Sequence, residues 1–165
     1  MIGFKSIADK RLDFALRCVQ EVIDETESFL SEEERRETPV ARKKLNKGRK
    51  PSEVAKNYHQ YIKSFGMLML NSGLVAALLF AQGKANKGDK KAEAYDLIIK
   101  HLTEWLQSLC CVSQPSKAAI LELYGANNPH HIRQATREAL MFLQDLKRVA
   151  DARLQKPEKS ENGDK

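Results

Sequence analysis

Hydrophobic residues return every three or four positions through most of this chain, a spacing that predicts amphipathic helices. The pattern is clearest from Ser6 to Leu30, where acidic and amide side chains occupy the opposite face. We expect one long helix here with a single buried stripe. The apolar positions of this segment are Ala8, Leu12, Ala15, Val19, Val22, Ile23, Thr26 and Leu30.

A second region of helical spacing begins at Ser52, a residue type that caps helices, followed by the acidic Glu53. Its apolar face runs as far as Gly66. A more apolar helix is expected from about Met67 to Gln82. It should end at Gly83, because glycine commonly follows the last residue of a helix. The pattern leaves open whether Gly66 breaks the helical path or only bends it.

The last part of the chain predicts three more helices. One covers about Ala92 to Cys111, and a short one follows Pro115. A long one begins with Asn128 as N-cap and Pro129 as first helical residue, and it continues to Leu154. The short helix carries the apolar residues Ile120, Leu121 and Tyr124.

No alternating run of β-branched residues predicts a strand. The sequence therefore predicts an all-α fold, a compact bundle of about five or six helices with no sheet. The expected core residues are Val19, Val22, Ile23, Leu74, Leu78, Trp105, Leu106, Ala139 and Leu143.

Two segments have too few apolar residues to pack into such a bundle. Residues 31–51 begin with acids, continue with a basic run and contain Pro39 and Gly48, so we expect a mobile basic loop. Residues 156–165 contain no hydrophobic residue and predict a disordered polar tail. Residues 1–155, with the loop inside them, are expected to form a single helical domain.

Charge narrows the class of protein. The chain has 165 residues, a formal net charge of +6 and a pI of about 9.2. Such a charge attracts polyanions, RNA or DNA first, although many small basic proteins bind nothing acidic. Three cysteines, two of them adjacent, do not make a disulfide framework. No signal peptide or membrane-spanning segment is apparent, so we expect a cytoplasmic protein without membrane contact.

The sequence offers no persuasive catalytic motif. His130 and His131 are adjacent and project about 100° apart on a helix, so they cannot readily share a metal ion, and we expect both to be exposed. Ribonucleases of the HEPN family carry an arginine shortly before a histidine, and neither His59 nor His101 has one. We therefore expect no enzymatic activity, no cofactor and no metal site.

Basic side chains are the remaining candidates for a function. Arg133, Arg137 and Arg148 fall on one side of the apolar stripe of the last helix, while Glu138 and Asp145 fall on the other. Arg133 and Arg137 repel each other by roughly 0.2–0.5 kcal/mol, which a bound phosphate would relieve. Further candidates are Lys84 and Lys87 in the turn after the apolar helix, and Arg42, Lys43, Lys44 and Lys47 in the basic loop.

Aromatic residues make up only 7% of the chain, and most fall on apolar faces. We therefore expect contacts with phosphates rather than with stacked bases, and hence binding that is independent of nucleotide sequence. The alternative is a solvated face whose long side chains merely cover the edge of the core.

Two segments resemble a known family. They are Tyr58 to Lys84, which includes Asn71-x-Gly73-Leu74, and Thr136 to Arg148, which includes Glu138-Ala139-Leu140. With the length and the helix order, they resemble the small subunit of the type III-B CRISPR (Cmr) effector complex.

The resemblance implies a non-catalytic, all-helical subunit of an RNA-guided antiviral complex. Members of that family stack into a short filament with copies of themselves. They lie beside other subunits of the complex and face the guide RNA and target RNA.

Two other interpretations remain open. The first is a helical protein-interaction scaffold that binds no nucleic acid. The second is a stand-alone regulator of DNA, which would need an exposed polar recognition helix. Residues Ile120 to Tyr124 are too few and too apolar to serve as one.

Overall fold

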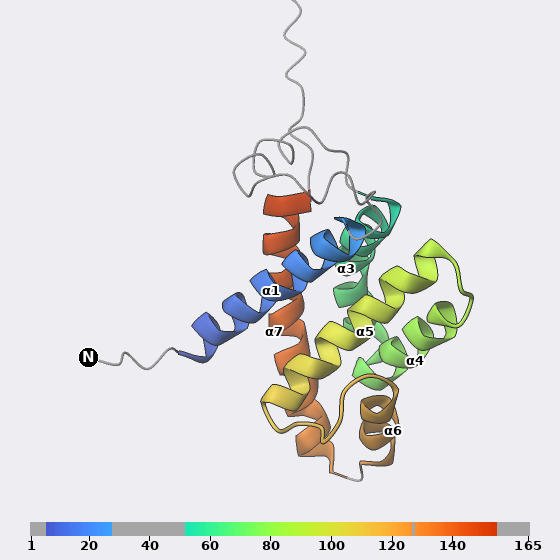
Figure 1. Cartoon of the computed structure of the whole chain (residues 1–165). Helices are drawn as coiled ribbons and strands as arrows, with labels where there is room; N and C mark the ends of the chain where they lie inside the picture. The colour runs from blue at the N-terminus through green and yellow to red at the C-terminus, as the bar shows by residue number, and fades with distance from the viewer. Residues whose placement is uncertain (1–5, 28–51, 127, 155–165) are drawn as a thin grey trace, which may run out of the picture.

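The computed structural model describes residues 6–27, 52–126 and 128–154, and every regular element in these ranges is an α-helix (Figure 1). This confirms the predicted all-α bundle without a sheet for the described part of the chain. The predictions for the loop at 31–51 and the tail at 156–165 lie outside the described residues. The helices are α1 (Ile7–Glu27), α3 (Glu53–Ser72), α4 (Leu74–Ala85), α5 (Lys90–Ser108), α6 (Lys117–Gly125) and α7 (Pro129–Leu154).

The helices pack in an order that differs from their order along the chain. The first helix, α1, packs mainly against the last, α7, while α5 packs against both α3 and α4. The short helix α6 packs against α4 and lies at the lower right of the bundle in Figure 1. No helix in the described ranges is both long and apolar enough to cross a membrane.

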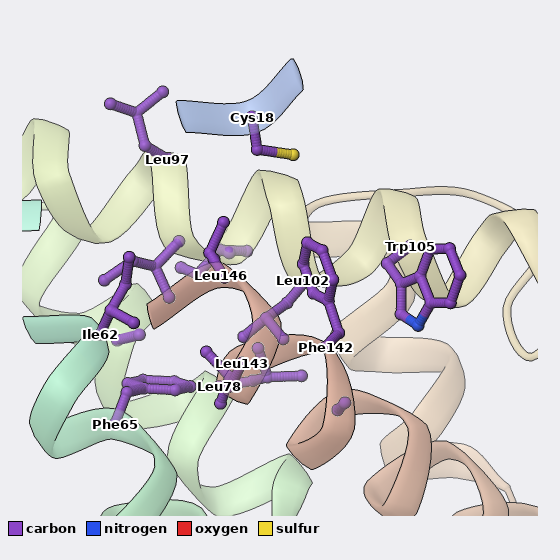
Figure 2. Close-up of a cluster of buried hydrophobic side chains, with 14 of the residues drawn as sticks. Cys18, Ile62, Phe65, Leu78, Leu97, Leu102, Trp105, Phe142, Leu143 and Leu146 are labelled. Carbon is purple, nitrogen blue, oxygen red and sulfur yellow. The ribbon is translucent and has the colours of Figure 1, made fainter. Parts of the chain in front are cut away.

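Three aromatic rings from three helices pack together, with Trp105 and Phe142 buried and Phe14 half-buried against them. Phe14 of α1 lies 5.7 Å from Trp105 of α5 and 5.6 Å from Phe142 of α7, measured between ring centroids. Trp105 and Phe142 stack with their centroids 5.6 Å apart, and Figure 2 shows Phe142 beside Leu102 and Trp105 further to the right. The predicted core residues Val19, Val22, Leu74, Leu78, Trp105, Leu106, Ala139 and Leu143 are buried, and Ile23 packs against them half-buried.

The sequence left open the path of the chain at Gly66, and the expected start of a new helix at about Met67 is wrong. The α3 helix continues through Gly66 and ends at Gly73, whose φ of 86° and ψ of 162° belong to a region that side chains rarely adopt. The Gly73 N–H donates to the Met69 carbonyl oxygen at 2.9 Å and closes the last turn. The predicted end at Gly83 is also wrong, because α4 runs on to Ala85.

Side-chain caps begin the helices where the sequence predicted them. Ser52 Oγ accepts the Ala55 N–H at 3.1 Å, and Asn128 Oδ1 accepts the His130 N–H at 3.0 Å. An unpredicted cap begins α5 two residues early, because Asp89 Oδ1 accepts the Ala92 N–H at 2.7 Å. These bonds satisfy backbone donors that have no partner within their helices.

Candidate nucleic-acid interface

Four lysines from two parts of the chain gather around the turn between α4 and α5. Lys84 lies in the last turn of α4, Lys87 in the connecting turn and Lys91 in the first turn of α5. The fourth is Lys117 of α6, whose Nζ lies 3.5 Å from Asn86 Oδ1 in that turn. We call these four residues the lysine turn. Lys84 and Lys87 were predicted from the sequence.

The lysine turn carries a net positive charge. Among the described residues, no carboxylate lies within 4.0 Å of any of its four ammonium groups, although the neighbouring Lys90 reaches Glu53 at 3.3 Å. Asp89 also lies in the turn, where its carboxylate accepts the Ala92 N–H and offsets part of this positive charge. Lysines without a carboxylate partner attract polyanions through long-range electrostatics.

A row of three aromatic rings ends beside the lysine turn. Tyr61 of α3 and Tyr95 of α5 stack with their centroids 4.3 Å apart and their planes 14° from parallel. Tyr95 then meets Phe80 of α4 edge to face at 6.2 Å, and Lys84 Nζ lies 5.2 Å from the Phe80 centroid. Burial, with Tyr61 beside it, raises the pKa of Tyr95, so its hydroxyl stays neutral. We call Tyr61, Tyr95 and Phe80 the aromatic row.

The sequence interpretation did not include the aromatic row or Lys117. Most aromatic residues were expected on apolar helix faces, which in a bundle are core by default. Lys117 is 31 residues from Asn86, so only the tertiary fold reveals their proximity. The helical spacing of Phe80 and Lys84, four residues apart, was the one local signal that they share a face.

The arginines of α7 are not equivalent. Arg133 and Arg137 are exposed, and within the described ranges neither has a carboxylate at ion-pairing distance. Arg148 Nη1 instead lies 3.1 Å from Asp145 Oδ1, so its long side chain reaches an acid that the helical wheel placed on the other side of the stripe. We call Arg133 and Arg137 the arginine flank.

The arginine flank and the lysine turn are separate surfaces. In Figure 1 the start of α7 lies at the lower end of the bundle, whereas the turn between α4 and α5 lies at its right edge. A long polyanion could touch both, but one phosphate could not. The other predicted basic residues, Arg42, Lys43, Lys44 and Lys47, lie outside the described residues.

The titratable groups with the strongest shifts are sealed inside the bundle. The Tyr58 hydroxyl lies 2.6 Å from His101 Nδ1, and His101 Nε2 lies 3.4 Å from Glu21 Oε2. Burial lowers the pKa of His101 to about 4. Burial acts to raise the pKa of Glu21, but Lys100, which pairs with it, and His101 outweigh burial and lower that pKa.

Neither Tyr58 nor His101 exposes any of its surface, so no substrate could reach their polar atoms. This group ties α1, α3 and α5 together and offers no catalytic geometry. In the described ranges, no three His, Cys, Asp or Glu side chains lie close enough to hold a metal ion.

Histidines and cysteines at the helix ends have structural roles. His130 is exposed as predicted, but the prediction for His131 is wrong, because its Nε2 reaches the Cys111 carbonyl oxygen at 2.6 Å and the side chain is half-buried. All three cysteines are free, with Cys18 and Cys111 buried and Cys110 exposed. Burial raises the pKa of Cys18 to about 12, so that thiol is not a nucleophile.

The fold and the surface together define a small, basic, all-helical protein. Its candidate binding residues, in the lysine turn and the arginine flank, lie on the surface of the bundle. The chain belongs to the family of the CRISPR-associated protein (Cas_Cmr5), whose model matches residues 33–153. This confirms the resemblance to the small subunit of the type III-B CRISPR (Cmr) effector complex. The family is a structural subunit that associates with the other subunits of that complex. A comparison with curated proteins finds no match.

Proposed function

We propose that the chain is a non-catalytic subunit that contacts the backbone of guide RNA and target RNA through its basic surface. It acts in the cytoplasm and stacks with copies of itself beside other subunits of the effector complex. The observation that carries the RNA contact is the lysine turn, where four ammonium groups gather without a partner among the described carboxylates. The arginine flank supplies a second contact point, and residues 42–47 supply further basic residues.

Salt dependence of RNA binding tests the proposal. A complex reconstituted with the K87A/K91A double variant should bind matched RNA more weakly by a similar factor on every sequence. The slope of log affinity against log salt concentration should flatten by up to about two units, because each phosphate contact contributes about 0.7–0.9. The matched control is K10A/K56A, which removes two exposed lysines elsewhere, on α1 and α3.

A second candidate function is a protein-interaction scaffold without nucleic-acid binding. It is favoured by Leu121 and Tyr124, which are 71% and 74% exposed on one side of α6. Exposed apolar side chains of this size often mark protein contacts. If neither K87A/K91A nor R133A/R137A, the alanine variant of the arginine flank, differs from the control in RNA affinity or salt slope, the scaffold function is the one that remains.

The proposed absence of catalysis has its own test. The purified chain should cleave neither RNA nor DNA, with or without divalent metal ions. Cleavage that survives purification and disappears on a single change such as His59→Ala would contradict the proposal. The control for folding is the circular dichroism spectrum of the same variant.

A further inference from the structure

The aromatic row and the lysine turn meet at Phe80 and Lys84, one helical turn apart on α4. The Phe80 side chain is 45% exposed, while Tyr61 and Tyr95 beneath it are half-buried. A single exposed phenylalanine is ordinary on a protein surface. This one ends a row of rings and stands among lysines that have no carboxylate partner within 4.0 Å in the described chain. Aromatic rings beside basic side chains are the composition of surfaces that bind single-stranded nucleic acid.

The Phe80 ring is held in place before any ligand arrives. Its neighbour Tyr95 fixes one edge, and Tyr61 stacks on Tyr95 with nearly parallel planes. Because the three rings come from α3, α4 and α5, helix packing sets their mutual orientation. A rigid ring loses little freedom on binding, so more of the stacking free energy appears as affinity.

Lys84 is the group that covers Phe80 in the free chain. Its ammonium lies over the ring in a cation–π contact. At an exposed site such a contact changes an equilibrium constant by a factor of about two to five. A nucleobase stacked on an aromatic side chain raises the affinity for the nucleic acid by a factor of about five to 150. The flexible lysine can therefore move to a phosphate while a base takes its place, and the exchange favours binding.

We propose that Phe80 is a base-stacking residue, on which an unpaired nucleobase of bound RNA stacks while Lys84 and Lys87 hold the adjacent phosphates. This rests on the RNA contact proposed above and adds an unpaired base to it. Every base has an aromatic face, so the contact tolerates any sequence. RNA fits better than an apolar protein surface, because a protein would have to desolvate the lysines without giving them partners.

Removal of the ring tests the proposal in the reconstituted complex. Phe80→Ala and Phe80→Leu should each weaken binding of single-stranded target RNA by about five- to 150-fold. The salt slope should stay unchanged, since neither change removes a phosphate contact. Phe80→Leu keeps an apolar side chain of similar bulk, so full RNA affinity in that variant overturns the proposal. Failure of either variant to enter the complex assigns the surface to a protein partner and also overturns it.

Fluorescence gives a direct measurement in the full chain. Trp105 is the only tryptophan and is 3% exposed, so Phe80→Trp adds one exposed reporter. Titration with a uridine homopolymer at low salt should quench this reporter, because stacked bases quench indole emission. The matched control is Leu79→Trp, which projects about 100° around α4 from Phe80. Equal quenching in the two variants overturns the proposal.

The two proposals fail separately. If K87A/K91A flattens the salt slope but the Phe80 variants bind normally, only the stacking contact is wrong. If neither the lysine nor the arginine variants alter affinity or slope, the phosphate contacts of the proposed function are wrong whatever Phe80 does.

Discussion

Arg11 Nε donates to Asp145 Oδ2 at 2.9 Å, joining the first helix to the last across 134 residues. Arg11 is only 4% exposed, and its Nη1 also lies 3.5 Å from Glu138 Oε2. A buried guanidinium needs such partners because the loss of hydration is otherwise too costly. The ion pair therefore fixes how α1 lies on α7.

We expect Arg11→Ala to lower the free energy of unfolding by about 3 kcal/mol, the lower end of the range for breaking a buried ion pair. The expected loss of unfolding free energy is at the lower end because Asp145 still pairs with Arg148 in the variant. Urea denaturation followed by circular dichroism measures it. Lys10→Ala, on the neighbouring exposed position, should change stability by less than about 0.5 kcal/mol. Equal effects from the two changes would contradict a role for the ion pair.

Two glycines should respond to alanine in opposite directions. Gly73→Ala should destabilise the chain by about 1–3 kcal/mol, because its backbone conformation is almost exclusive to glycine. Gly66→Ala should stabilise it by about 0.5–1 kcal/mol, since Gly66 is inside α3 and an added Cβ meets nothing within 4 Å. Thermal unfolding of both variants checks the signs, and a stabilising Gly73→Ala would place the helix break elsewhere.

His101 should make the fold sensitive to acid. In the unfolded chain His101 binds a proton below about pH 6.5, whereas burial delays this to about pH 4 in the fold. The unfolded state thus binds more protons in this window, so the free energy of unfolding falls as the pH is lowered from about 6.5 to about 4, by about 3 kcal/mol in total. Glu21, whose pKa is lowered, adds a loss in the same direction below about pH 4.5.

Unfolding free energies measured from about pH 7 to pH 4 check this prediction. In His101→Gln most of the slope between pH 6.5 and pH 4 should disappear, whatever the change costs at neutral pH. The control is His130→Gln, at an exposed position, which should keep the slope of the unaltered chain. A slope that survives in His101→Gln would assign the acid sensitivity to other groups.

The arginine flank should contribute to RNA binding without supporting the fold. The R133A/R137A double variant of the complex should bind RNA more weakly, with a salt slope flatter by up to about two units. Arg148→Ala should have a smaller effect than Arg137→Ala, because Arg148 is already paired with Asp145. Unchanged affinity and slope in a well-folded double variant would identify the flank as ordinary solvated surface.

Periodicity was sufficient to predict the helices but not which glycine separates two of them. Gly66 lies between Phe65 and Met67, Gly73 lies between Ser72 and Leu74, and only the second glycine adopts a positive φ. The break at Gly73 lets Met69 and Leu74, on either side of it, both reach the core. That choice depends on how α3 and α4 pack against α5, which no local pattern contains.

The short helix α6 shows a similar limit. Its nine residues include apolar side chains all round, so spacing alone could not decide which of them the core accepts. The structure buries Ala119, Ile120 and Leu123 and leaves Leu121 and Tyr124 exposed. The candidate site shows the same limit of local patterns. The lysines of one turn were predictable because they are close in sequence, while the positions of Lys117 and the aromatic row depend on tertiary contacts.

The packing of α1 on α7 has a consequence for how the protein is made. Phe14 can contact Phe142, and Arg11 can pair with Asp145, only after residues 142–145 have been synthesised. At about 5–20 residues per second, the 134 residues that separate Arg11 from Asp145 take roughly 7–27 s to synthesise. During that interval the first helix has no native partner on α7 and presents its apolar side to the cell. A nascent chain stalled before residue 142 should therefore be a preferred substrate for chaperones that bind exposed apolar helices.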